Sequence, residues 1–213
     1  MQLIGMLDSP YVRRVAVSLQ LLGLPFEHEP LSVFRAVNAF RRINPVVKAP
    51  TLVCDDGTVL MDSTLILHYA QALAGSARRL QPGDAAELAR TLRIMGLALA
   101  ACEKSVQIVY ERHVRPAEKF HGPWIERVAA QLSAAYAGLE HELGRHPLAV
   151  TQTAITQDGI DVAVAWQFTQ KALPGQVDPA AYPALRAHSR NAEALPVFAA
   201  APHGAGTYRA DAA

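Results

Sequence analysis

Ser9 is the residue whose type and position most directly offer chemistry. It is followed by Pro10 and then by an apolar helical pattern, so we expect it to cap the N-terminus of a helix, where serine is favoured and proline suits the first helical position. A helix N-terminus presents backbone N–H groups and the positive end of the helix dipole, which favour an anion such as a thiolate. Ser9 therefore has two interpretations, a plain N-cap and a group that stabilises a bound anion.

The energy that such a thiolate requires is modest. Hydrogen bonds to the charged form lower a thiol's pKa, and a shift from ~8.5 to ~6.5 takes about 2.7 kcal/mol. One charge-assisted hydrogen bond of about 1.5–3 kcal/mol, together with the helix dipole, can supply this amount. Tyr11 carries a rival hydroxyl, but it falls inside the first helical turn and can point elsewhere.

Other kinds of catalytic site find little support. His113 and His121 are eight residues apart and no HExxH or CxxC motif accompanies them, so no metal site is predicted. Cys54 and Cys102 are the only cysteines, and we expect small buried residues rather than a disulfide or a catalytic thiol. No glycine-rich phosphate loop and no GxSxG elbow of a serine hydrolase occurs.

The elements that must position Ser9 alternate in type over the first third of the chain. Short apolar runs predict strands and spaced apolar residues predict helices, with Leu65, Ile66, Tyr69 and Leu73 facing inward on the last of these helices. The order is β-α-β-α-β-β-α, in which the first two strands pair in parallel and the last two form a hairpin. This is a small mixed sheet of the thioredoxin-like kind. The expected strands are 3–6, 26–31, 50–54 and 58–61, and the expected helices are 10–23, 33–43 and 63–74.

The rest of the chain has a different character. A polar, turn-rich stretch predicts a linker, and alanine-rich helical patterns follow it. The predicted organisation is a thioredoxin-like domain at residues 1–76, a linker at 77–86 and an all-helical domain at 87–213. Helices are expected near 85–112, 117–144, 160–172 and 180–194, and the tail from Pro202 shows no periodicity.

The composition argues against nucleic acid and membranes as partners of this chain. A net charge of +1 over 213 residues argues against a dedicated nucleic-acid binder. The longest strongly apolar run, residues 94–102, is well below the ~18 residues that span a bilayer, and the first residues lack a basic leader. We therefore expect a cytoplasmic protein that binds neither nucleic acid nor membrane.

Four motifs in register carry a family resemblance. They are Ser-Pro-Tyr-Val-Arg-Arg-Val from Ser9, Gly-Leu-Pro-Phe-Glu from Gly23, Asn-Pro-Val-Val-Lys-Ala-Pro-Thr-Leu from Asn44, and Leu-Met-Asp-Ser from Leu60. In this order and spacing the chain resembles a bacterial glutathione S-transferase with a serine-type active site. The resemblance covers the N-terminal third closely and extends to residues 156–163.

This resemblance implies roles for particular residues. Ser9 would activate the thiol of glutathione, the co-substrate. The Ala49–Pro50 bond would be cis, which turns the Ala49 backbone outward to pair with the cysteinyl part of glutathione like an added strand; an ordinary X–Pro bond is trans in about 95% of cases. Asp62 would meet the glutamyl ammonium and Ser63 the glutamyl carboxylate, although this pair also has the plain interpretation of a helix cap.

Two weaker candidates are Arg35 and Lys48, which could pair with the glycine carboxylate of glutathione, although an isolated cation is usually solvated surface. The second substrate would be a small hydrophobic electrophile held between the two domains. The candidate residues for contacting this substrate are Tyr11, Tyr110, His113, Val114, Trp124 and Phe168. A Tyr, Trp or Phe on an amphipathic helix more often lies in the protein core than in contact with a ligand, so these residues also have a structural interpretation.

Three functions are compatible with the pattern. The first is a glutathione transferase that activates the thiol for attack on an electrophile, working without a metal and as a homodimer. The second is a glutathione-dependent peroxide or disulfide reductase; a glutaredoxin-type reaction would need a cysteine where Ser9 stands. The third is a non-catalytic, transferase-like binding module, against which the retention of Ser9, Pro50, Asp62 and Ser63 argues.

Overall fold

A computed structural model describes residues 1–76 and 78–209, which form two compact units. The first unit contains Met1–Leu80, Thr151–Thr156 and the chain from Glu193 onward, and the second contains Gln81–Val150 and Gln157–Ala192. Residues from Glu193 to Arg209 therefore group with the N-terminal residues, whereas the predicted organisation has a single helical domain at 87–213.

The first unit is built on a four-stranded mixed sheet with the strand order β2-β1-β3-β4. The strands are β1 (Gln2–Ile4), β2 (Glu27–Glu29), β3 (Thr51–Val53) and β4 (Val59–Leu60). β1 pairs in parallel with β2, with Leu3 opposite His28, and antiparallel with β3, with Leu3 opposite Leu52. β3 and β4 form the antiparallel hairpin. The predicted thioredoxin-like order and pairing are confirmed.

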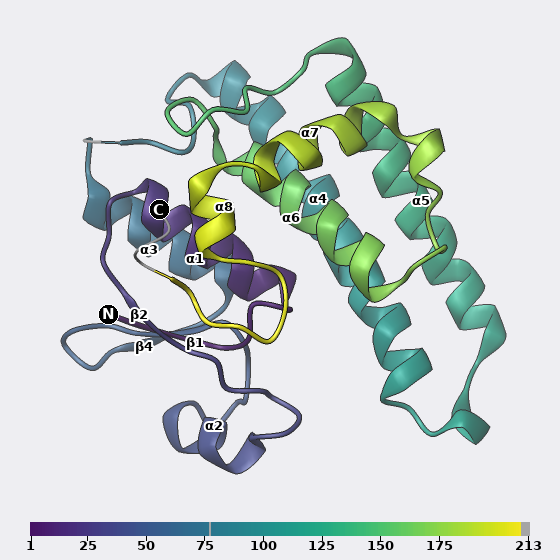
Figure 1. Cartoon of the computed structure of the whole chain (residues 1–213), viewed down its shortest axis with the longest axis horizontal. Coiled ribbons are helices and arrows are strands. Elements are labelled where there is room, and N and C mark those ends of the chain that lie inside the picture. Colours follow the sequence, from purple (N-terminus) through teal and green to yellow (C-terminus); the bar gives the residue numbers. More distant parts are fainter. Residues whose placement is uncertain (77, 210–213) are drawn as a thin grey trace. The chain divides into compact units, whose positions relative to one another are not determined.

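Helices α1 (Pro10–Leu21) and α3 (Ser63–Ala74) lie on one side of this sheet and α2 (Val37–Ile43) on the other (Figure 1). The apolar face of α1 is buried as its spacing predicts, including Val12, Val15 and Leu19. After α1, Gly23 adopts a positive φ of 68°, which glycine tolerates at a helix C-terminus. Ser9 and Asp62 are the N-cap residues of α1 and α3, so the starts of both helices are predictable from the local sequence.

Two helices differ from the prediction: α2 in the residue at which it begins, and α3 in the face that it buries. α2 begins at Val37 rather than near residue 33, because the Ser32 hydroxyl accepts hydrogen bonds from the N–H groups of Phe34 and Arg35 and forms a turn there. On α3 the buried face is made by Ser63, Ile66, Leu67 and Ala70, at helical spacing. The prediction that Leu65 and Leu73 face inward is wrong for this unit, since they are 60% and 47% exposed.

The last part of the first unit is fastened to α1. Arg13 is buried on α1 and forms a two-pronged ion pair with Glu193, at 2.5 and 2.7 Å, while its Nε donates to the Ala201 carbonyl at 2.7 Å. Its guanidinium also lies 5.5 Å from the ring centre of Phe198 on α8 (Pro196–Ala200). This short helix lies beside α1 (Figure 1).

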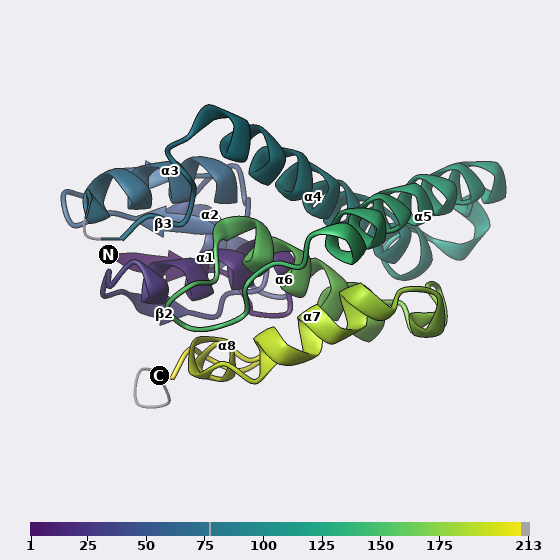
Figure 2. The same cartoon turned by 90° about the horizontal axis from the view of Figure 1, so that it is seen from above.

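The second unit is helical, and α4 (Ala85–His113) packs against both α5 (Gly122–Arg145) and α6 (Gln157–Ala172) (Figure 2). The unit also holds α7 (Pro183–Glu193, of which Glu193 falls in the first unit) and the 3₁₀ turns η1 (Ala117–Lys119) and η2 (Pro179–Ala181). The expected helix 117–144 starts instead at Gly122, because Pro123 must occupy the first turn. The expected helix 180–194 likewise starts at Pro183.

The core of the second unit includes a satisfied polar cluster. The Tyr136 hydroxyl, which is fully buried, donates to the Ala165 carbonyl at 3.0 Å and lies 2.6 Å from the Thr169 hydroxyl, which lies 2.7 Å from Ser105. Burial raises the pKa of Tyr136 far above its usual value, so it stays protonated. Across residues 1–76 and 78–209, no helix combines the length and the apolar character that a bilayer crossing requires.

Candidate active site

Ser9 stands at the start of α1, immediately after the turn that follows β1. Its backbone is extended (φ −73°, ψ 124°), and its N–H donates to the Met6 carbonyl at 3.1 Å. Its Oγ accepts from the Val12 N–H at 3.5 Å, which is long for a hydrogen bond of this type. Within the described residues this is the one hydrogen bond of the half-buried hydroxyl, so its proton can still be donated to a ligand.

The turn that carries Ser9 is fixed at Gly5, where the chain leaves β1. Gly5 has a φ of 133°, a region that residues with a side chain rarely adopt. A Cβ on Gly5 would lie 2.6 Å from Val12 Cγ2 and 3.1 Å from Ala49 Cβ. Only glycine therefore allows the start of α1 and the segment around Ala49 to approach this closely.

Arg35 reaches the same turn from the loop before α2. Its Nη2 lies 3.4 Å from the Met6 sulfur, and its charge acts on Asp8, the neighbour of Ser9. Desolvation raises the pKa of Asp8, while the Arg35 guanidinium and the Ser9 N–H oppose that shift. The structure thus brings Arg35 to the turn that carries Ser9 and leaves the Arg35 side chain exposed.

The Ala49–Pro50 segment is held by a small polar network. The peptide bond is cis, as the resemblance implies, and a second cis bond occurs at Met61–Asp62. Buried Asn44 donates from Nδ2 to the Thr51 hydroxyl at 2.9 Å, and that hydroxyl donates to the Lys48 carbonyl at 2.7 Å. These bonds fix the backbone on both sides of Ala49, while the Lys48 side chain is exposed.

The start of α3 supplies the third group of candidate residues. Asp62 is exposed and its Oδ1 accepts from the N–H groups of Thr64 at 2.9 Å and Leu65 at 3.4 Å, so the capping interpretation is correct. Ser63 is buried, and its Oγ accepts from Nη1 of the buried Arg14 at 3.0 Å. A hydroxyl that accepts from a cation keeps its own proton for a further acceptor, which suits a ligand carboxylate beside Ser63.

Two of these supporting residues were not predicted as part of the site. Arg14 is on α1 and connects it to the start of α3, although arginine is normally a surface residue. Asn44 was identified from the sequence only as the first residue of a motif, directly after the helix expected at 33–43. The signal that could have found both is their place inside the quoted motifs, Arg14 five residues after Ser9 and Asn44 five before Ala49.

The candidate acceptor residues separate into exposed and buried groups. Tyr11 is half-buried in the first turn of α1. In the second unit Tyr110, Val114 and Trp124 are 44%, 52% and 41% exposed around the connection from α4 to α5, and His113 is exposed there too. Burial of part of the Tyr110 ring raises its pKa. Phe168, on α6, is buried, with 8% of its surface exposed.

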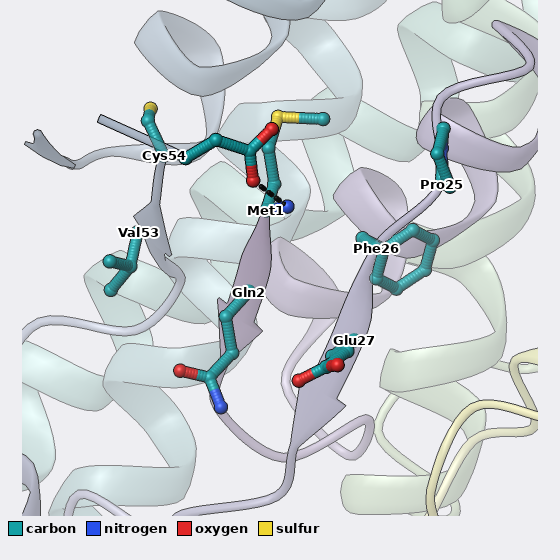
Figure 3. A pocket seen from close by; sticks show the side chains of 8 residues that line it. Met1, Gln2, Pro25, Phe26, Glu27, Val53 and Cys54 are labelled. Atoms are coloured by element: carbon teal, nitrogen blue, oxygen red, sulfur yellow. Dashed lines mark hydrogen bonds and ion pairs between the residues drawn. The ribbon is translucent and has the colours of Figure 1, made fainter. Parts of the chain in front are cut away.

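An open depression of about 600 Å³ lies at the start of β1 (Figure 3), whereas Ser9 follows the end of that strand. Met1, Gln2, Phe26, Glu27 and Cys54 are among the residues that line it. The N-terminal ammonium there pairs with Asp55 at 2.6 Å. None of the residues predicted to act on a thiol lines this depression. Among the residues that the structure describes, no cluster of three or more His, Cys, Asp or Glu side chains could hold a metal ion.

Comparison with known proteins shows which proteins this chain resembles. Residues 3–78 match the family described as glutathione S-transferase, N-terminal domain. An uncharacterised GST-like protein of Escherichia coli (strain K12), YibF, is 27% identical over 175 residues, which cover 82% of this chain and 86% of the relative.

Solved structures extend the likeness to almost the whole chain. A glutathione S-transferase of Methylobacterium radiotolerans, in complex with glutathione sulfonate, has a TM-score of 0.83 and 26% identity, covering 93% of this chain and 92% of its own. A glutathione transferase family member of Pseudomonas fluorescens Pf-5, with bound glutathione, has a TM-score of 0.80 and 27% identity, covering 95% and 98%. The matched domain at residues 3–78, the relative and these structures together make this chain similar to members of the glutathione S-transferase superfamily.

Proposed function

We propose that this chain is a glutathione transferase in which Ser9 stabilises the thiolate of bound glutathione for attack on a small electrophile. The observation that carries the proposal is the Ser9 hydroxyl, which caps α1 through a long 3.5 Å contact and keeps a proton to donate beside the positive end of that helix. Both effects act on the charged form of a thiol and lower its pKa.

The other parts of glutathione find complementary groups in the first unit. The Ala49 backbone groups suit the cysteinyl amide, and the Ser63 hydroxyl, with Arg14 behind it, suits the glutamyl carboxylate. Asp62 offers its second oxygen to the glutamyl ammonium, and Arg35 and Lys48 offer cations to the glycine carboxylate. The glutathione compounds held by the Methylobacterium and Pseudomonas proteins support this choice of ligand.

For the electrophile, we propose contacts with exposed side chains of the second unit, and Tyr11 of the first unit is a separate candidate. Tyr110 and Trp124 present aromatic surface at the α4–α5 connection, where Glu111 holds the chain by accepting from the His121 N–H at 3.0 Å and from Arg115 at 2.7 Å. Aromatic and apolar surface of this kind favours a hydrophobic electrophile, with His113 as a polar neighbour.

A binding and activity panel tests the proposal. Calorimetry with glutathione is expected to show binding, and turnover is expected with chloro-nitrobenzene in preference to a peroxide or a mixed disulfide. Binding with turnover of the peroxide or the disulfide alone would replace the transferase with a reductase. Binding with no turnover of any substrate would favour the non-catalytic module, and no binding would reject the site.

We also propose that the chain forms a homodimer. Val59 on β4 and Leu65 on α3 expose 43% and 60% of their surface on the first unit, and burial of apolar side chains of this size favours association. Light scattering should give twice the 23.0 kDa of one chain, and Leu65→Glu should shift the mass toward a single chain. A wild-type mass near 23.0 kDa would contradict the proposal.

A further inference from the structure

His28 on β2 connects the end of the chain with the turn that carries Ser9. One nitrogen of its half-buried ring, Nε2, lies 2.7 Å from the Gly5 carbonyl, and the other, Nδ1, lies 3.0 Å from the Tyr208 backbone nitrogen. A backbone N–H can only donate, so Nδ1 must accept and Nε2 must carry the proton that is donated to Gly5. The two contacts together define one neutral tautomer.

Gly5 is the point through which this ring can act on Ser9. Its N–H donates to the Glu29 carbonyl at 3.0 Å and its carbonyl accepts from His28, so β2 holds both of its backbone groups. Gly5 also packs against Val12 and Ala49 with no room for a side chain. The turn from Met6 to Ser9 starts from this fixed residue.

The tail that meets His28 is docked by further contacts. The Tyr208 ring stacks on Phe26 with ring centres 4.5 Å apart and planes 20° apart, and the Arg209 N–H donates to the Ala200 carbonyl at 2.9 Å. Figure 1 shows the tail (yellow) returning from α8 toward the strands. The backbone N–H of Tyr208 is therefore presented to His28 by a segment with anchors of its own.

We propose that His28 is a positioning residue for the Ser9 turn and that the C-terminal segment around Tyr208 fixes the tautomer in which His28 does this. The first half rests on the function proposed for Ser9. The mechanism is local: the ring accepts from the tail, so it must donate to Gly5, and the donated bond holds the start of the turn in place for thiolate binding.

The surroundings of His28 agree with a neutral ring. Burial lowers the pKa of His28, and the Gly5 carbonyl opposes that shift more weakly. Glu27 and Glu29 flank His28 on β2, but successive side chains of a strand point to opposite faces. A protonated His28 would carry N–H groups on both nitrogens and could not accept from Tyr208.

Two substitutions of His28 separate its two contacts. His28→Gln places an amide N–H near the position of Nε2, so it can still donate to the Gly5 carbonyl. His28→Asn places an amide oxygen near the position of Nδ1, so it can accept from the Tyr208 N–H but loses the bond to Gly5. We expect His28→Asn to speed hydrogen exchange at the Gly5 and Ser9 amides roughly five-fold, the effect of one ordinary hydrogen bond, and to raise the pKa of the bound glutathione thiol. His28→Gln should recover most of both properties.

The tautomer of the His28 imidazole can be measured in the protein without bound glutathione. Nitrogen NMR of the imidazole should show the proton on Nε2 in the wild type and in Tyr208→Phe, which keeps the ring and the N–H. Tyr208→Pro, which removes the N–H donor, should give a mixture of tautomers. A proton on Nδ1 in the wild type, or equal amide exchange in His28→Asn and His28→Gln, would overturn the proposal. Because these readouts need no ligand, they stand apart from a failure to bind glutathione.

Discussion

Single side chains at two helix starts serve the fold and the ligand together. Ser9 caps α1 through a 3.5 Å contact and Asp62 caps α3 through a 2.9 Å contact. The long contact costs little to give up and the short one is a strong cap. Ser9 is therefore the more available of the two for chemistry, and Asp62 combines a structural oxygen with a second oxygen that faces solvent.

The two roles of Asp62 can be separated by a pair of substitutions. Asp62→Asn keeps a capping oxygen of similar quality but removes the charge, so glutathione affinity should fall about ten- to a hundred-fold while the free energy of unfolding stays nearly constant. Asp62→Ala should lose the same affinity and also about 0.5–2 kcal/mol of stability. Calorimetry and urea unfolding measure the two effects. Wild-type affinity in folded Asp62→Asn would remove Asp62 from the site.

At the scale of single residues, the sequence indicates which side chains could bind or activate a ligand, but not which other side chains hold them in position. Ser9, Asp62 and Ser63 are readable because capping is local and serine and aspartate are its usual residues. The role of Arg14 depends on a contact 49 residues away, and that of Asn44 on burial of an amide normally found at the surface. Neither fact has a local signature.

At the scale of elements, the turn between β1 and α1 decides where Ser9 lies. Its conformation depends on Gly5, and the other groups reach it from elements distant in sequence: Arg35 from the loop before α2 and Ala49 from the segment before β3. The site is thus a property of how three connections meet, with the helices and the sheet as their support.

Gly5→Ala should destabilise the protein and disturb the site together. Its positive φ costs a residue with a side chain about 1–2 kcal/mol, and the 2.6 Å approach to Val12 adds overpacking of about 1–3 kcal/mol. Gly57→Ala is the matched control, since Gly57 also has a positive φ but open space around it, and it should cost only the backbone part. Equal unfolding free energies for the two variants would show that the close approach does not constrain the turn.

Element boundaries were predictable where the deciding residues are neighbours in sequence. The order of the sheet, the hairpin at Asp55–Gly57 and the ends of α1 follow from local turn and cap residues. The start of α2 was missed because the Ser32 turn competes with the helix, and the facing of Leu65 was missed because several faces of α3 are apolar. Only the packing partner decides which of them is buried.

At the scale of the whole chain, the segment from Glu193 to Arg209 completes the first unit. The ion pair of Arg13 with Glu193 joins residues 180 apart, and Tyr208 meets His28 across the same separation. The sequence shows no periodicity in the tail, so its packing could not be read from a pattern. Contacts this distant depend on the completed fold rather than on local preference.

Glu193→Ala should destabilise the protein through Arg13. Removing one partner leaves a buried guanidinium without its carboxylate, and because the Glu193 side chain is 23% exposed we expect about 2–4 kcal/mol, below the upper range for a fully buried pair. Glu103→Ala is the control: it breaks the contacts of exposed Glu103 with Lys104 and Gln107 and should cost at most about 1 kcal/mol. Urea unfolding compares them. A Glu193→Ala loss no larger than that of the control would mean that the tail does not fasten α1.

The central claim is that Ser9 stabilises the thiolate of bound glutathione, and the ultraviolet titration of that thiolate tests it most directly. In the wild type the pKa of the bound thiol should lie below the ~8.5 of a free cysteine thiol. In Ser9→Ala it should rise by about one to two units, because a hydrogen bond to the charged form is lost. Affinity for glutathione should change little, and the stability cost should be near the lower end of about 0.5–2 kcal/mol.

The pH dependence of the rate gives the same test in a second form. Activity of Ser9→Ala at neutral pH should fall about ten-fold or more, in step with the shift in pKa, and should recover partly at alkaline pH. Tyr11→Phe, which removes the neighbouring hydroxyl, should leave the thiol pKa close to wild type. The account predicts a raised thiol pKa in Ser9→Ala and an unshifted one in Tyr11→Phe. An unshifted thiol pKa with full conjugation activity in Ser9→Ala would contradict it and leave Ser9 as a helix cap alone.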